Sequence, residues 1–121
     1  MLTGLTLENF KAFGQPTKID LAPITLIFGE NSAGKTSILQ SLNLLKQTAE
    51  SRELGALLLP RTENGLVDLG GFQDLIFDHH PTNALRLKFS FSEWDQSFTH
   101  PLYRKKLRRF PNLTLQLEFS R

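Results

Sequence analysis

A glycine-rich stretch in the first third of the chain holds the residues whose types and spacing are best suited to chemistry. Residues 29–36 read GENSAGKT and fit the pattern G-x-x-x-x-G-K-[ST], in which a loop backbone surrounds phosphate groups. Glycine at positions 29 and 34 permits positive φ and keeps Cβ atoms away from a bound anion. The spacing therefore predicts a site for the phosphates of a nucleotide.

The other positions of this loop have defined roles in such a site. Backbone N–H groups of residues 31–36 can form an anion nest in front of a helix dipole. Lys35 supplies a cation for the β- and γ-phosphates, and the Thr36 hydroxyl is expected to ligate Mg²⁺. The next hydroxyl is placed to donate to the α-phosphate. The candidate nucleotide-binding residues are Gly29, Asn31, Ser32, Ala33, Gly34, Lys35, Thr36 and Ser37.

Two elements with different apolar periods flank the loop. Before it, Ile24, Leu26, Ile27 and Phe28 form a short apolar run, which predicts a strand buried on both faces. After it, apolar residues recur at helical spacing and predict one stripe of an amphipathic helix that ends between residues 47 and 53. The residues of this predicted stripe are Ile38, Leu42, Leu45 and Ala49.

Composition limits the class of protein. The 121 residues are 40% hydrophobic and 21% charged, as expected for one globular domain or part of one. The chain contains no cysteine, which excludes disulfides and thiolate chemistry. We see neither a signal peptide nor an apolar run long enough for a membrane span, so a cytoplasmic location is expected.

Strands that alternate apolar and polar residues dominate the remainder. Leu5 and Leu7, then Ile19 and Leu21, predict a hairpin at the start of the chain. Residues 85–91 and 113–119 alternate strictly, which predicts two antiparallel strands with one face on a core. A short strand at Leu66–Val67 and one or two helical turns over residues 72–77 are also expected, and residues 93–111 read as a polar, basic loop.

At this point the residues carry a family resemblance. The segment LTLENFKAFGQPTKIDLAPITLIFGENSAGKTSILQSLNLLKQ resembles the N-terminal part of AAA/ABC-type ATPase heads of the SMC, RecF and OLD-nuclease group. NGLVDLGGFQDLIF is similar to a later segment of OLD-like members, several of which are linked to phage defence. The resemblance implies an α/β fold: the first lobe of an ABC-type P-loop NTPase head, incomplete, with strands, Walker A loop and helix in residues 1–53 and a mainly antiparallel β arm in 54–121.

The same resemblance implies ligands and partners. ATP and Mg²⁺ would occupy the loop, and the intact ATPase would act on DNA as a head-to-head homodimer, with a nuclease or effector as a further partner. Lys11 matches a basic residue that in these heads approaches the nucleotide phosphates, although a solvated turn lysine is an equal alternative. Gln73 matches the family's Q-loop glutamine less well, because it belongs to the local L-G-G-F-Q-D-L motif.

Other parts of an ATPase site are missing from the pattern. No Ser/Gly-rich signature loop is visible, and the nearest Walker B candidate, Leu75-Ile76-Phe77-Asp78, is followed by histidine instead of glutamate. We therefore interpret Asp78 as a structural or loop carboxylate. His79, His80 and His100 lack the cysteine or spaced carboxylates of a metal centre and read as turn residues.

The C-terminal fifth is strongly basic. Residues 101–121 contain six basic residues against one acidic residue, a net charge of +5, which leaves −3 for the other hundred. This run is either a solvated loop or a patch that contacts nucleic-acid phosphates, with Tyr103 and Phe110 available to stack. The residues that would make those contacts are Arg104, Lys105, Lys106, Arg108 and Arg109.

Three functions of different classes are thus compatible with the sequence. The chain is an ATP-binding segment of a larger ATPase that does not hydrolyse ATP alone, a complete small P-loop kinase or GTPase that uses Asp78, or a non-catalytic truncated interaction module. The second predicts a mainly parallel sheet. Two long alternating strands favour the first.

Overall fold

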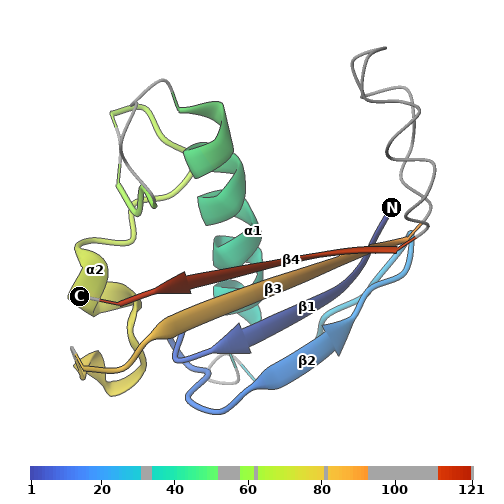
Figure 1. Cartoon of the computed structure of the whole chain (residues 1–121), viewed down its shortest axis with the longest axis horizontal. Helices are drawn as coiled ribbons and strands as arrows, with labels where there is room; N and C mark the ends of the chain where they lie inside the picture. Colours follow the sequence, from blue (N-terminus) through green and yellow to red (C-terminus); the bar gives the residue numbers. More distant parts are fainter. Residues whose placement is uncertain (31–33, 52–57, 62, 81, 93–111, 121) are drawn as a thin grey trace.

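The described residues form four strands and one long helix (Figure 1). The computed structural model describes residues 1–30, 34–51, 58–61, 63–80, 82–92 and 112–120. The strands are β1 (Leu2–Glu8), β2 (Thr17–Asp20), β3 (Leu85–Ser92) and β4 (Asn112–Phe119). The helices are α1 (Lys35–Glu50), the short α2 (Phe72–Leu75) and the 3₁₀ turn η2 (Phe77–His79).

The strands form a single sheet in the order β2-β1-β3-β4, and every pairing is antiparallel. The predicted hairpin is confirmed, since Leu5 pairs with Ile19 across β1 and β2. The two alternating strands are confirmed as well, and Leu87 of β3 lies between Leu7 and Leu117. Residues far apart in the sequence thus place their apolar side chains on one face.

The opposite face of the sheet is polar and fixes the same register. Arg86 on β3 donates from Nη1 to Glu8 at 2.8 Å and from Nε to Glu118 at 3.0 Å, so one guanidinium joins three strands. The hydrogen bond to Glu118, followed by the charges of Glu118 and Glu8, raises the pKa of Arg86 above its ordinary value. Because the side chains of Arg86 and Glu118 are 41% and 49% exposed, the network specifies alignment more than it adds stability.

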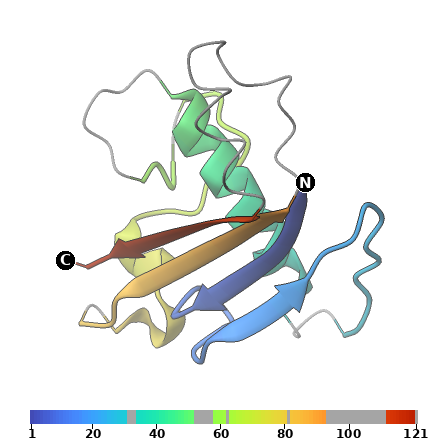
Figure 2. The same ribbon diagram turned by 45° about the vertical axis from the view of Figure 1, so that its right-hand side comes forward.

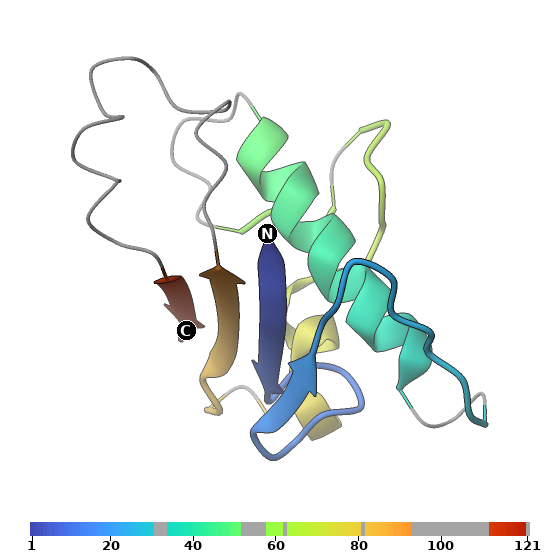
Figure 3. The same ribbon diagram turned by 90° about the vertical axis from the view of Figure 1, so that its right-hand side faces the viewer.

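Helix α1 covers the apolar face of the sheet, as Figure 3 shows. Leu44 and Ile38 join the core formed by the strand residues Leu5, Leu7 and Phe89. Part of the predicted stripe is wrong, because Ala49 is exposed and the fully packed face runs through Ser37, Ile38, Ser41, Leu44 and Gln47. Among the described residues, no helix has both the length and the apolar character required to cross a membrane.

Buried polar side chains explain why the packed face of α1 differs from the predicted apolar stripe. Gln47 donates from Nε2 to the Leu59 carbonyl at 2.8 Å and accepts at Oε1 from the Val67 N–H at 3.0 Å. The predicted short strand at Leu66–Val67 is therefore wrong: the backbone N–H of Val67 is satisfied by a helix side chain instead of a neighbouring strand. Burying the amide is tolerated because both of its ends are hydrogen-bonded.

The segment that follows Val67 makes the predicted helical turns of α2 and η2. Gly70 has φ +77, and a methyl group placed on it would lie 2.3 Å from a carboxylate oxygen of Asp74. That carboxylate accepts a hydrogen bond from the Gly71 N–H at 2.7 Å. The L-G-G-F-Q-D-L motif thus encodes a tight helix start, with glycine required by both conformation and space.

The strand predicted before the glycine loop is absent. Residues 24–28 have no strand structure, and the exposed fractions of Ile24, Leu26 and Phe28 are 83%, 80% and 88%. Figure 2 shows that residues 21–30, which follow β2, project beyond the sheet. A strand buried on both faces needs neighbouring strands and covering layers, and no strand in the described part of the chain pairs with this run.

Candidate phosphate-binding site

The glycine loop joins α1 through a left-handed residue. Gly34 is the N-cap of α1, with φ 84 and ψ 9, and Gly29 at the other end of the loop has φ 146. Both angles lie where residues with a Cβ atom are strained, so the two glycines do what the pattern requires. Asn31, Ser32 and Ala33 lie outside the described residues.

Lys35 is the first residue of α1 and folds back over the loop. Its Nζ donates to the Gly29 carbonyl, so the side chain spans the loop from one end to the other. This contact was not predicted from the sequence. It places the ammonium group of Lys35 beside the first residue of the glycine–lysine pattern.

The first turn of α1 contains no acidic residue. Among the described residues, no side-chain hydrogen bond caps the helix N-terminus, where the first N–H groups and the positive end of the helix dipole lie. Thr36 is exposed, which suits a hydroxyl that ligates a nucleotide-bound Mg²⁺, whereas Ser37 is only 8% exposed. The backbone N–H of Ile38 donates to the Gly34 carbonyl at 3.2 Å and closes the first helical turn.

A second loop lies directly against the glycine loop. The turn from Asn9 to Gly14 contacts Gly34, since a methyl group on Gly34 would lie 3.0 Å from Cζ of Phe13 and 3.2 Å from Cβ of Ala12. Lys11, the weaker nucleotide-binding candidate, belongs to this turn and has φ 50. The contact of this turn with the phosphate-binding pattern was not predicted from the sequence.

The remaining polar candidates lie in η2 and its surroundings. Asp78 has φ 55, is largely exposed and lies 3.7 Å from the His80 imidazole. It lies within the 3₁₀ turn η2 and not at the end of a parallel strand, so it lacks the setting of a Walker B acid. His79 Nδ1 lies 3.0 Å from the Gln73 carbonyl, and no group of three or more His, Cys, Asp or Glu residues among those described is arranged to hold a metal ion.

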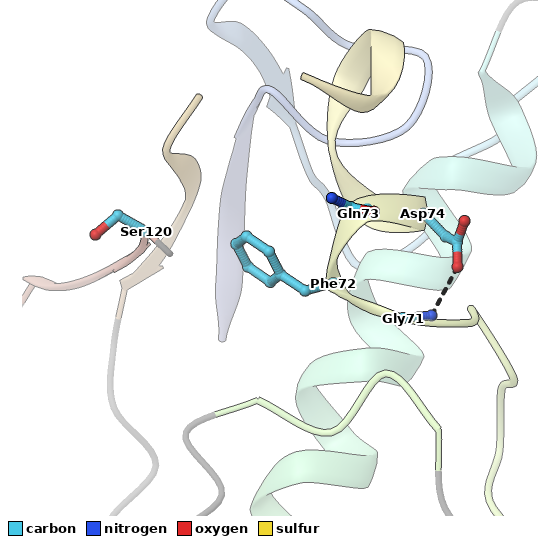
Figure 4. Close-up of a pocket in the computed structure, with 5 residues that line it drawn as sticks. All are labelled: Gly71, Phe72, Gln73, Asp74 and Ser120. Carbon is cyan, nitrogen blue, oxygen red and sulfur yellow. Dashed lines mark hydrogen bonds between the residues drawn. The ribbon is translucent and has the colours of Figure 1, made fainter. Parts of the chain in front are cut away.

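Gln73 lines a surface hollow of about 380 Å³ together with Gly71, Phe72, Asp74 and Ser120 (Figure 4). Its lining residues come from the start of α2 and the end of β4. None of the described residues of the glycine loop lines this hollow. Of the other predicted contacts, the basic residues from Arg104 to Arg109 and His100 lie outside the described residues.

The fold and this loop together define a class. A small antiparallel sheet covered by a helix whose N-terminus carries the glycine–lysine pattern fits a fragment of an α/β P-loop NTPase. The sequence model of the AAA ATPase domain matches residues 1–110, and the chain therefore belongs to the AAA ATPase domain family. No curated protein shows a significant match. Family membership supports an ATP-binding, ATPase-like function and implies a nucleotide as ligand.

Proposed function

We propose that this chain is the ATP-binding segment of an AAA-type ATPase and that residues 29–37 hold the nucleotide phosphates. One observation carries the proposal: left-handed Gly34 starts an uncapped α1 whose first residue, Lys35, reaches back across the loop. Lys35 would exchange its bond to the Gly29 carbonyl for the β- and γ-phosphates. Thr36 would hold the Mg²⁺ that accompanies ATP, and Lys11 would approach the phosphates from the neighbouring turn.

Hydrolysis requires more than phosphate binding. Phosphoryl transfer depends on positioning the attacking water as well as on neutralising charge. Asp78, the sequence candidate for the acid, is exposed and paired with His80. We therefore propose that the catalytic acid and a signature loop come from other parts of the intact ATPase or from a second subunit in a head-to-head dimer. The antiparallel pairing of the whole described sheet also disfavours a self-sufficient kinase or GTPase.

The proposal is tested by calorimetric titration of the chain with Mg²⁺ and a non-hydrolysable ATP analogue, ADP or AMP, beside a turnover assay with ATP. The loop geometry predicts Mg²⁺-dependent binding of the analogue and of ADP, weaker binding of AMP, and negligible turnover. Turnover of about one per second that Asp78→Asn abolishes and that does not depend on protein concentration would contradict the proposal. Such a result would point to the small self-sufficient enzyme.

A finer assignment rests on the sequence resemblance. We propose membership of the SMC, RecF and OLD-like subgroup, with action on DNA or in phage defence and an effector such as a nuclease as partner. The net charge of +5 in residues 101–121 supports a nucleic-acid phosphate contact. The antiparallel strands on either side of the basic run, β3 and β4, are also consistent with a solvated connection.

DNA binding, if it uses the basic run, has a defined salt dependence. Five neutralised phosphates would give a log–log slope of affinity against salt near −4.5, from about −0.9 per contact. Fluorescence anisotropy with labelled duplex DNA at several salt concentrations measures this slope. The change of Arg104, Lys105, Lys106, Arg108 and Arg109 to glutamine should then flatten it. A flat response in the unaltered chain would leave the run as a solvated loop.

A further inference from the structure

We propose that Phe13 is a positioning residue for nucleotide binding, and that the turn from Asn9 to Gly14 is a rigid wall against which Gly34 packs at the start of α1. The inference rests on the proposed function, because it concerns how the same loop is held in its binding conformation. It assigns no contact between Phe13 and the nucleotide. The effect of Phe13 on binding would pass through Gly34.

The contact with Gly34 is close. Gly34 is buried, and the Phe13 ring occupies the space where a side chain would begin, 3.0 Å from an ideal Cβ position to Cζ and 3.2 Å to Cε2. Because the carbonyl of Gly34 accepts the Ile38 N–H, a displacement of Gly34 would also displace the first turn of α1. The amides that receive the phosphates belong to this turn. Phe13 thus fixes one end of the anion site without entering it.

Hydrogen bonds from several elements hold the turn itself. Phe10 and Phe13 exchange backbone bonds of 2.9 and 2.8 Å, and Phe10 is fully buried in the core. The Lys11 N–H donates to the Leu75 carbonyl at 2.7 Å, and the Phe77 N–H donates to the Asn9 carbonyl at 3.1 Å. The segment from α2 to η2 therefore holds the turn by backbone hydrogen bonds at Asn9 and Lys11.

Two further contacts hold the turn in place. Asn9 Nδ2 donates to the Ala84 carbonyl at 3.0 Å, just before β3. The Phe77 ring lies over Gly14, where an added methyl group would come within 2.7 Å of Cε1. The turn is thus attached to α2, η2 and the start of β3. A wall built this way cannot shift without breaking bonds in more than one element.

Backbone conformation shows that the turn is held against its intrinsic preference. Asn9 and Lys11 have φ values of 54 and 50, and Asp78 and His79, which directly follow Phe77, have values of 55 and 53. Residues other than glycine keep a left-handed conformation where surrounding contacts hold it, and such residues are frequent at ligand-binding and switch regions. Here four such residues lie on the two segments that meet at the wall.

The wall has an energetic consequence for the loop. A loop already in its bound conformation loses less freedom when the ligand arrives, so preorganisation raises affinity. Removal of the Phe13 ring should free Gly34 and weaken binding of the ATP analogue about fivefold or more, which is the lower range of coupling between distinct sites. Phe13→Leu, which keeps apolar volume, should lose less than Phe13→Ala.

The first test is titration of the whole chain with Mg²⁺ and the non-hydrolysable ATP analogue. Phe13→Ala is compared with Phe119→Ala, which removes another half-buried phenyl ring from β4 of the same core. We expect the loss of affinity in the first variant only. Equal affinity in Phe13→Ala and the unaltered chain would overturn the inference, as would equal losses in Phe13→Ala and Phe119→Ala. If Phe13→Ala does not fold, Phe13→Leu takes its place against the same control.

A double-mutant cycle tests the contact itself. Gly34→Ala places a methyl group against the Phe13 ring and should reduce binding severely. In the F13A/G34A variant the ring is gone, so Gly34→Ala should reduce affinity by a smaller factor than it does in the unaltered chain, although the positive φ of residue 34 remains strained. If the affinity losses of the two single variants simply multiply in the double variant, the ring does not act on Gly34.

Hydrogen exchange without nucleotide separates this inference from the proposed function. The Ile38 amide, bonded to the Gly34 carbonyl, should exchange faster in Phe13→Ala than in the unaltered chain and in Phe119→Ala. If the Ile38 amide exchanges faster in Phe13→Ala but the unaltered chain binds no nucleotide, the positioning role of Phe13 is supported and the proposed function is refuted. If the chain binds nucleotide, and Phe13→Ala changes neither the affinity nor the exchange rate, the proposed function is supported and the positioning role is refuted.

Discussion

Replacement of Lys35 by alanine is expected to weaken binding of Mg²⁺ and ATP roughly 10- to 100-fold. Charge-assisted hydrogen bonds are worth about 1.5–3 kcal/mol each, and about 1.4 kcal/mol corresponds to a factor of ten. The Lys35 ammonium already lies over the loop, bonded to the Gly29 carbonyl. Calorimetry or a fluorescent nucleotide measures the change in affinity.

Lys46→Ala provides the matched control. Lys46 lies near the other end of α1, where its ammonium is 3.9 Å from the Glu50 carboxylate, and both side chains are exposed. Its loss alters the net charge and the helix composition as much as Lys35→Ala does. Affinity should be unchanged in this variant. If the two variants bind equally well, Lys35 has no special role and the phosphate site is placed elsewhere.

The second large effect concerns stability. Phe89→Ala should destabilise the fold by about 3–5 kcal/mol, because Phe89 on β3 is fully buried in the core cluster. A loss of this size is a large part of the stability of a small domain. Urea denaturation followed by circular dichroism measures the free energy of unfolding.

Phe28→Ala removes the same ring from the exposed run before the glycine loop. Because Phe28 is 88% exposed, the change should stay within about 0.5 kcal/mol, as is usual for surface sites. The pair of variants therefore tests whether residues 24–28 lie outside the core. A loss from Phe28→Ala as large as that from Phe89→Ala would show that this run is buried.

Strand positions were predictable because alternation reports burial directly. Leu85, Leu87 and Phe89 alternate with polar residues, and all three are fully buried in β3. A period of two leaves a single arrangement with the apolar side chains on the core. The same logic located β1 and β4, although β4 keeps Leu113 and Leu115 exposed at the sheet edge.

Two parts of the fold could not be read from periodicity. The apolar run at residues 24–28 is typical of a strand buried on both faces, but the pattern does not state whether neighbouring strands are present. The packed face of α1 includes Ser41 and Gln47, which a hydrophobic stripe cannot indicate. Ser41 is buried with a hydrogen bond to the Ile38 carbonyl. Gln47 is buried with a hydrogen bond to the Leu59 carbonyl, more than ten residues along the chain.

The candidate site was predictable in its chemistry and not in its surroundings. The fixed positions of the motif specify Gly34 and Lys35, and the structure gives Gly34 the left-handed conformation expected of it. The contact of Phe13 with Gly34 joins residues 21 positions apart. It depends on how α2 and η2 hold the turn, which no local spacing encodes.

Backbone amide shifts in nuclear magnetic resonance spectra test the central claim most directly. The chain is titrated with Mg²⁺ and a non-hydrolysable ATP analogue, and with AMP as the control that lacks the β- and γ-phosphates. We predict the largest shifts at the amides of Gly34 to Ile38, with little change for AMP. Shifts confined to other residues, such as Gly71 to Asp74 in the surface hollow, or equal shifts with AMP, would contradict a phosphate site at the start of α1.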